Sequence, residues 1–169
     1  MMMDFPARKP NRLPRFDYST PGAYFVTICT QDKLPLLGTI VGGGAHDAPD
    51  VRLSRYGEIA QKYILSGNRI PGVTVDKYVI MPNHIHLILL VEENTTAGTS
   101  RAPSPTNAVI PHFVSTLKRF CHRGFGKKIF QRSYHDHVIR NEAGYLKIWQ
   151  YIDNNPALWQ EDCFYVTDT

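Results

Sequence analysis

The chain has 169 residues, a formal net charge of +4 and an ordinary globular composition, with 43% hydrophobic and 20% charged residues. This length favours a single domain that buries its own core without disulfides. The three cysteines, at positions 29, 121 and 163, form no CxxC pair, which argues against a disulfide framework and a zinc knuckle. No segment has the length and apolarity of a membrane span or a signal peptide, so we expect a soluble protein in the reducing cytoplasm.

The first part of the chain predicts an arm, a strand and a helix. Residues 1–18 are rich in Pro, Arg and Lys and are expected to form a basic arm. Ala23–Thr30 is dense in β-branched and aromatic residues, which is typical of a strand. The glycines within 41–50 predict a loop, and they lack the spacing that cradles a nucleotide phosphate. Residues 54–67 predict a helix, with Ser54 as its N-cap.

A hairpin and a polar loop follow. Val73–Met81 and His84–Val91 have the composition of strands, and the Pro82-Asn83 pair between them suits a tight turn. Residues 93–107 are polar and full of Gly, Pro, Ser and Thr, which predicts a flexible loop without regular structure.

The last part adds two helices and an extended segment. Pro111–Arg123 carries an apolar stripe at helical spacing, Ile129–Ile139 is predicted to be extended, and Asn141 is placed to cap a helix that runs to about Asn154. The predicted order is therefore strand, helix, two strands, helix, strand, helix. This order indicates an α+β fold in which helices flank a central antiparallel sheet, within one domain spanning residues 1–169.

Basic and aromatic residues are interleaved in one stretch of the chain. Between Leu117 and Arg140 there are seven Lys or Arg residues, a single acid and four aromatic side chains. This mixture suits a polyanion whose bases can stack, although a basic face that is only solvated has the same composition. The residues expected to contact phosphates lie here and in the arm: Arg8, Lys9, Arg12, Arg15, Lys118, Arg119 and Arg132.

His84 and His86 lie two residues apart in a predicted strand, so their side chains leave the same face of the sheet. Their neighbours are apolar, and buried imidazoles need polar partners, which can be hydrogen-bonding groups or a shared metal ion. Ile88 stands where HxHxDH hydrolases have Asp, and the zinc deaminase pattern is absent, which excludes both of these classes. A second pair, His135 and His137, could supply ligands or lie at a strand edge near a bound polyanion.

The last predicted helix carries a tyrosine beside its apolar stripe. The stripe consists of Tyr145, Leu146, Ile148, Trp149 and Ile152. Tyr151 falls outside it, and Asn155, four residues further on, lies on the same side of the helix as Tyr151. Taken alone, the two residues suit an exposed tyrosine and a helix-ending asparagine. Together with the histidine pair they could form a reaction centre, in which a metal polarises a phosphate and the phenol attacks it.

Three stretches of the sequence, MPNHIHLILL, LKRF and FQRSYHDHVIRNEAGYLKIWQYIDNNP, carry a family resemblance. The first contains a His-hydrophobic-His motif, and the last ends in Tyr-Ile-x-x-Asn-Pro. In these stretches the chain resembles the REP-associated tyrosine transposases, a branch of the single-tyrosine HUH transposases. The resemblance extends from Ala23 to about Trp159. It implies the HUH endonuclease or ferredoxin-like fold, which agrees with the predicted elements.

The resemblance also implies roles for individual residues. His84, His86 and Asn155 become metal ligands, and Tyr151 becomes the nucleophile that forms a 5′-phosphotyrosine link. The implied cofactor is a divalent metal, Mg²⁺ or Mn²⁺, with no nucleotide cofactor. The implied partner is single-stranded DNA that folds into hairpins at palindromic repeats, with no membrane partner, and the chain could act as a monomer or a homodimer.

Two other functions are compatible with the sequence. A non-catalytic module that binds single-stranded nucleic acid predicts binding without a covalent adduct. A metal-dependent phosphodiesterase that uses activated water, with His135 and His137 involved, predicts activity that survives the loss of Tyr151. A transposase that keeps its site but no longer moves DNA in the cell has the same sequence features as an active one.

Overall fold

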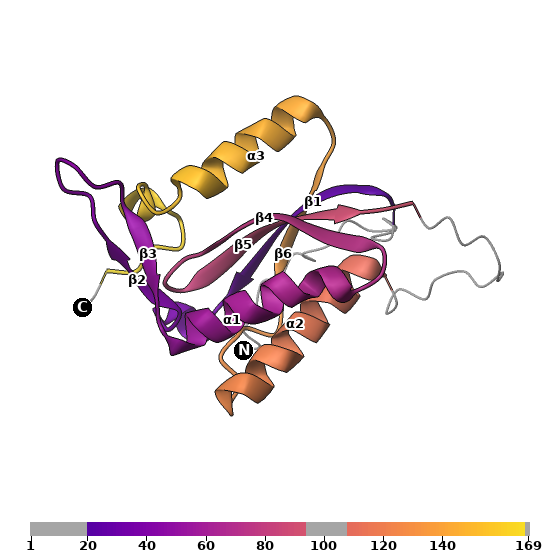
Figure 1. The fold of residues 1–169 in the computed structure, drawn as a ribbon, viewed down its shortest axis with the longest axis horizontal. Helices are drawn as coiled ribbons and strands as arrows, with labels where there is room; N and C mark the ends of the chain where they lie inside the picture. The colour runs from indigo at the N-terminus through magenta and orange to yellow at the C-terminus, as the bar shows by residue number, and fades with distance from the viewer. Residues whose placement is uncertain (1–19, 94–107, 168–169) are drawn as a thin grey trace, which may run out of the picture.

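The centre of the molecule is a four-stranded sheet in the order β4-β5-β1-β6, with every neighbouring pair antiparallel (Figure 1). The computed structural model describes residues 20–93 and 108–167. The expected basic arm and all of the expected 93–107 loop except Glu93 lie outside the described residues. The strands are β1 (Gly22–Cys29), β4 (Val73–Ile80), β5 (His84–Val91) and β6 (His135–Ile139).

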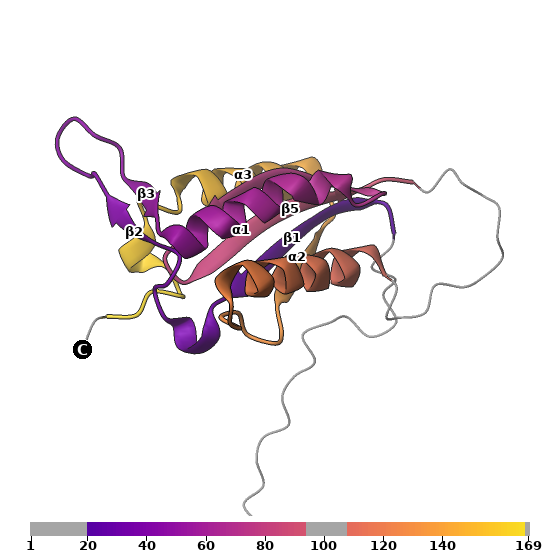
Figure 2. The ribbon, with the colours of Figure 1, turned by 60° about the horizontal axis from the view of Figure 1, so that its bottom comes forward.

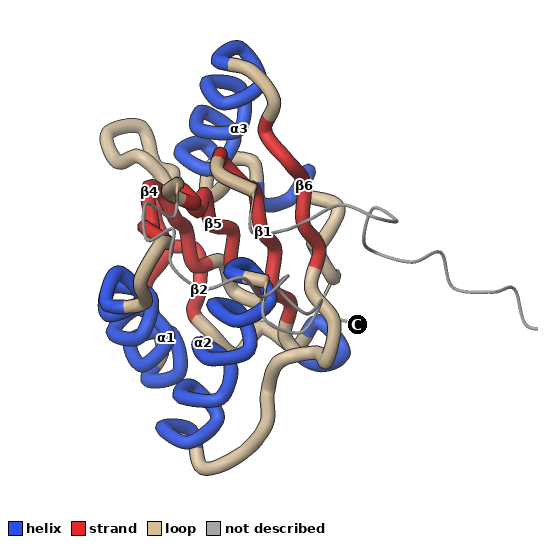
Figure 3. The backbone as a smooth tube through the Cα atoms, turned by 90° about the vertical axis from the view of Figure 1, so that its right-hand side faces the viewer, coloured by secondary structure: helices blue, strands red, loops and turns tan. Residues whose placement is uncertain are grey.

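Helices cover the two faces of this sheet unequally. α1 (Arg55–Ser66) and α2 (Val109–Phe125) lie together on one face (Figures 2 and 3), and α3 (Glu142–Asn154) lies on the other (Figure 1). The main core lies under α1 and α2, where Ile64 and Phe113 pack with Leu87 of β5. The cluster under α3 is small, with Ile88, Ile139 and Ile152 as its buried members. The predicted α+β class, a central antiparallel sheet flanked by helices, is confirmed.

The N-cap residues predicted for two of the helices are found at the expected positions. Ser54 Oγ accepts a hydrogen bond from the amide of Gly57 at 3.2 Å, and Asn141 Oδ1 accepts one from the amide of Gly144 at 2.8 Å. Both predicted N-caps are therefore confirmed. The second predicted helix is longer than expected, because α2 begins at Val109 and ends before Gly126, whose φ of 73° stops it. No helix among the described residues is long and apolar enough to cross a membrane.

Two short strands were missing from the prediction. β2 (Gly38–Val41) and β3 (Asp50–Leu53) pair in a separate two-stranded sheet, and the predicted glycine-rich loop connects them. Each has four residues, too few for an alternating pattern to stand out. Conversely, only the last part of the extended segment, β6, is a strand, while Phe130 forms an isolated bridge with Thr30.

The apolar stripe predicted for the last helix is partly wrong. Leu146 is 51% exposed and Trp149 is 37% exposed, so neither belongs to the core. α3 instead packs through Tyr145, Ile148 and Ile152. The Trp149 ring is covered by the Lys77 ammonium of β4, 3.4 Å from the ring centroid, in a cation–π contact. The face of α3 that packs on the sheet is therefore turned about the helix axis relative to the predicted stripe. This orientation brings the side of the helix with Tyr151 and Asn155 toward the sheet.

Candidate functional site

The two histidines of β5 lie on the α3 face of the sheet and are fully buried, with exposures of 0% for His84 and 1% for His86. β5 is an inner strand between β4 and β1, and its alternate residues Ile85 and Leu87 point into the main core. The strand alternation therefore places both imidazoles on one face, as predicted from the sequence. Their ring centroids lie 4.4 Å apart.

Hydrogen bonds to the Nδ1 atoms leave the Nε2 atoms of both imidazoles facing the site. Asn83 donates its amide hydrogens to the carbonyls of Lys33 and Phe164, at 3.1 and 2.8 Å. Its oxygen therefore accepts from His84 Nδ1, 2.9 Å away, which makes His84 Nε2 the unprotonated nitrogen. At His86, Nδ1 lies 2.8 Å from Thr27 Oγ1. This arrangement is typical of histidines that bind a metal through Nε2.

Tyr151 and Asn155 approach the histidines from α3. The phenolic oxygen of Tyr151 lies 3.4 Å from His86 Nε2, and the side chain is 36% exposed. Asn155 follows as the C-cap of the helix, and it keeps helical backbone angles (φ −57°, ψ −41°) although a proline comes next. Its side chain is 1% exposed. The structure thus brings together the four residues that the sequence singled out, one helical turn separating the tyrosine from the amide.

Asp162 is a member of the site that the sequence analysis missed. It follows the short 3₁₀ helix Trp159–Glu161. Its Oδ2 accepts hydrogen bonds from the Tyr151 hydroxyl at 3.1 Å and from the Asn155 amide at 2.7 Å, and it lies 3.9 Å from His84 Nε2. Its Oδ1 accepts from the backbone amide of Phe164 at 2.8 Å. The only signal in the sequence was an acid seven residues after Asn155, in a segment with no periodicity.

The residues of this site fit a metal ion. His84, His86 and Asp162 each offer one ligand atom, and these three atoms lie within 4.8 Å of one another. In addition, His84 Nε2 and Asn155 Oδ1 are buried and have no hydrogen-bond partner among the described residues. Such atoms are rare, because an unpartnered buried polar group is costly. Two imidazoles with carboxylate and amide oxygens suit Mn²⁺ or Mg²⁺, and they also suit Zn²⁺.

Burial sets the protonation states in the site. It lowers the pKa of His84 to about 4, although the neighbouring Asp162 carboxylate and Asn155 act in the opposite direction. It also lowers the pKa of His86 well below the usual value, and His84 adds to this effect. Burial, and then the charge of Asp162, raise the pKa of Tyr151 above its usual value. At neutral pH both imidazoles are neutral and ready to bind a metal, while the phenol keeps its proton.

The second histidine pair lies outside this cluster. His135 and His137 are exposed on the edge strand β6, where they pair in register with Thr27 and Phe25 of β1. The metal-binding group found among the described residues does not include them. The ring of His135 lies 6.5 Å from that of Phe164, next to the site. The sequence left open whether this pair supplies metal ligands or lies at a strand edge, and the structure places it at the strand edge.

Of the basic residues that were expected to contact phosphates, Lys118, Arg119 and Arg132 lie in the described part of the chain. Arg119 and Arg132 are exposed, but Lys118 is not. The Lys118 side chain is 8% exposed, and its ammonium donates to the backbone carbonyls of Gln131, Arg132 and Ser133 at 2.8, 3.3 and 2.9 Å. These bonds use all three ammonium hydrogens. This placement contradicts the expectation that Lys118 contacts phosphates: it holds the segment before β6 against α2. Burial lowers the pKa of Lys118 to about 8.

Replacing Lys118 with Met is expected to destabilise the fold, because three carbonyls lose a charged donor while the packing volume is kept. The expected loss is on the order of 3 kcal/mol in the free energy of unfolding. For a chain of this size, this loss lowers the unfolding midpoint by roughly 6–12 °C. Thermal unfolding measures it, with Arg119→Ala as an exposed control that changes little. A Lys118→Met protein with wild-type stability and weakened DNA binding would restore the original expectation.

Comparison with known proteins places this fold. No family model matches the chain. An uncharacterized protein of Haemophilus influenzae is 32% identical over 174 residues, which cover 94% of this chain and 93% of that protein. The solved structure of the REP-associated tyrosine transposase bound to a REP hairpin superposes with a TM-score of 0.61 at 19% identity, covering 86% of this chain and 72% of that one. The resemblance expected from the sequence is thus confirmed at the level of the fold. The chain belongs to one family with the Haemophilus protein, and it has the fold of the REP-associated tyrosine transposase.

Proposed function

We propose that this chain is a metal-dependent DNA nuclease and strand transferase that cleaves and rejoins single-stranded DNA through Tyr151. The observation that carries the proposal is the pair of unpartnered buried atoms, His84 Nε2 and Asn155 Oδ1, beside His86 and the Tyr151 hydroxyl. The buried ligands and the half-exposed phenol suit a phosphate that enters from the surface. The proposed roles are those that the family resemblance implies, with Asp162 added to the ligands.

The chemistry proposed for the residues is a transesterification. A divalent cation held by His84, His86 and Asp162 would neutralise charge on the scissile phosphate and polarise its oxygens. The phenolic oxygen of Tyr151 attacks phosphorus, and the P–O3′ bond breaks with its electron pair leaving on O3′. O3′ takes up a proton from water, so that a 5′-phosphotyrosine and a free 3′-hydroxyl are formed. The phenol donates its hydrogen bond to Asp162 Oδ2, which orients the hydroxyl, and water at the partly exposed phenol takes the phenolic proton. Attack of a 3′-hydroxyl on the phosphotyrosine reverses these bond changes and rejoins the strand.

The proposed substrate is single-stranded DNA that forms hairpins at palindromic repeats. The transposase of similar fold was solved bound to a REP hairpin. On this chain the exposed arginines Arg119 and Arg132 can pair with phosphates, and half-buried and exposed aromatic rings can stack with bases.

The experiment that tests the proposal uses the purified chain, Mn²⁺ and end-labelled single-stranded hairpin oligonucleotides. A denaturing gel should show cut strands and a protein–DNA adduct that protease digestion removes. Mass spectrometry of the digested adduct should place the nucleotide on Tyr151. Binding without any adduct would favour the single-strand binding module, and cutting without an adduct would favour a metal-activated water.

The phosphate contacts predict a steep salt dependence of binding. Each phosphate contact releases a counterion, so Arg119→Ala and Arg132→Ala should each reduce the slope of log K against log salt by about one. Deleting residues 1–18, which carry Arg8, Lys9, Arg12 and Arg15, should reduce it further. Fluorescence anisotropy with a labelled hairpin at several salt concentrations measures the slopes, and Arg55→Ala on α1 is the control. An affinity that does not change with salt contradicts this interpretation.

A further inference from the structure

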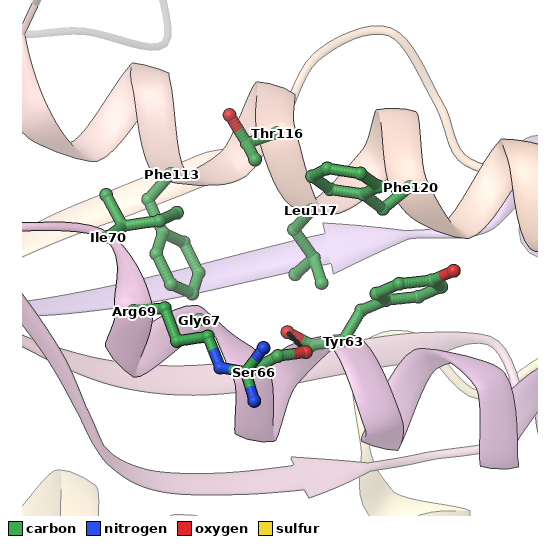
Figure 4. A pocket seen from close by; sticks show the side chains of 9 residues that line it. All are labelled: Tyr63, Ser66, Gly67, Arg69, Ile70, Phe113, Thr116, Leu117 and Phe120. Atoms are coloured by element: carbon green, nitrogen blue, oxygen red, sulfur yellow. Dashed lines mark hydrogen bonds between the residues drawn. The ribbon is translucent and has the colours of Figure 1, made fainter.

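A cavity of about 350 Å³ opens between α1 and α2 (Figure 4). It lies on the opposite face of the sheet from α3, the helix that carries Tyr151. Phe113 and Leu117 of α2 form its apolar floor, and Ser66 and Thr116 supply hydroxyl groups. Its volume is at the lower end of the range for small-molecule sites. It is therefore large enough for one small flat molecule.

Two aromatic rings line one end of the cavity. Tyr63 of α1 and Phe120 of α2 stack with their ring centroids 5.5 Å apart and their planes 21° from parallel (Figure 4). Phe120 is 39% exposed. The exposed ring offers a flat apolar surface, which is what a nucleobase stacks on.

The charge around the cavity is positive. Arg69, just after α1, lines the cavity, and among the described residues no Asp or Glu lines it. Lys62 Nζ lies 5.8 Å from the Tyr63 ring centroid, and Arg119 Cζ lies 5.4 Å from the Phe120 ring centroid. Of these three cations only Arg69 lines the cavity itself. A flat group attached to a phosphate can stack on the exposed ring and pair with the Arg69 guanidinium.

We propose that this cavity binds one unpaired nucleotide of the single-stranded DNA, with its base against Phe120 and Tyr63 and its phosphate beside Arg69. A base-paired nucleotide cannot fill it, because its flat faces are already stacked within the duplex. The inference rests on the proposed function for the identity of the polyanion. It adds a binding site that is separate from the Tyr151 centre and that distinguishes unpaired positions of a hairpin from its stem.

Photo-crosslinking tests the proposal on the wild-type chain. Hairpin oligonucleotides carry a single 5-iododeoxyuridine at each unpaired position in turn, and irradiated complexes are digested and analysed by mass spectrometry. We expect one unpaired position to crosslink to Tyr63 or Phe120. Crosslinks that map only to residues outside the cavity overturn the inference. Loss of the crosslink in micromolar thymidine monophosphate would also overturn it, because the cavity would then be a site for free nucleotides.

Variants give an independent readout. Phe120→Ala is expected to weaken binding of that hairpin about tenfold, and Arg69→Ala should weaken it and reduce the salt slope by about one. Leu65→Ala is the control, since Leu65 is 58% exposed on α1 and does not line the cavity. Unchanged affinity in both cavity variants, with unfolding midpoints near wild type, overturns the proposal. If Phe120→Ala unfolds, Arg69→Ala and the crosslink decide.

The two proposals can fail separately. A wild-type chain that crosslinks through the cavity but never forms an adduct at Tyr151 leaves this inference standing and rejects the proposed chemistry. A chain that forms the adduct but crosslinks only outside the cavity rejects this inference alone.

Discussion

Replacing Tyr151 with Phe is expected to abolish strand cleavage and the covalent adduct together, with a loss of about four orders of magnitude or more in rate. The substitution removes one oxygen and keeps the ring, which packs at 6.2 Å from Phe25 and is 36% exposed. The fold and the affinity for single-stranded DNA should therefore change little. A denaturing gel for the adduct and anisotropy for binding measure the two effects separately.

Tyr145→Phe is the matched control for this prediction. Tyr145 lies on the same helix, but its hydroxyl donates to Asp76 at 2.5 Å, away from the histidine pair. Its Phe variant should lose a surface hydrogen bond and keep both cleavage and adduct. If Tyr151→Phe still cuts DNA at the wild-type rate, the tyrosine is not the nucleophile and a metal-activated water performs the reaction.

The parts of the site that the sequence predicted are those set by periodicity. A spacing of two in a strand places His84 and His86 on one face, and a spacing of four in a helix places Tyr151 beside Asn155. Both rules hold whatever the rest of the chain does. The sequence pattern could not set the separation of strand and helix, because the packing of α3 against β4 and β5 determines it.

Asp162 could not be predicted for a physical reason. It lies in an irregular segment after α3, where no repeat relates the position of a residue to the direction of its side chain. Its place in the site depends on the return of the chain toward the sheet, where Asn83 Nδ2 donates a hydrogen bond to the carbonyl of Phe164. Lys118 was misjudged for a related reason: a lysine in a basic stretch is usually exposed, but here three carbonyls of a neighbouring segment accept its hydrogens.

Removing the metal or one of its imidazole ligands is expected to have the second largest effect. Excess chelator should abolish cleavage and adduct formation. His86→Ala should weaken Mn²⁺ binding by at least about a hundredfold, since even loss of the groups that orient a metal ligand costs 10–100-fold. Calorimetric titration of the chain with Mn²⁺, without DNA, measures binding independently of activity. Full cleavage in excess chelator would contradict the metal assignment.

The same titration identifies the oxygen ligand. Asp162 Oδ2 lies within the cluster of ligand atoms, and Asn155 Oδ1 is buried without a partner, so Asp162→Ala and Asn155→Ala should both weaken Mn²⁺ binding. The effect of Asp162→Ala should be the larger, because it also removes the negative charge that faces the cation. Asp153→Ala is the control, since this exposed carboxylate of α3 pairs with Lys77 at 2.8 Å. If Asp162→Ala binds Mn²⁺ like wild type and Asn155→Ala does not, the amide alone completes the histidine pair, as the sequence predicted.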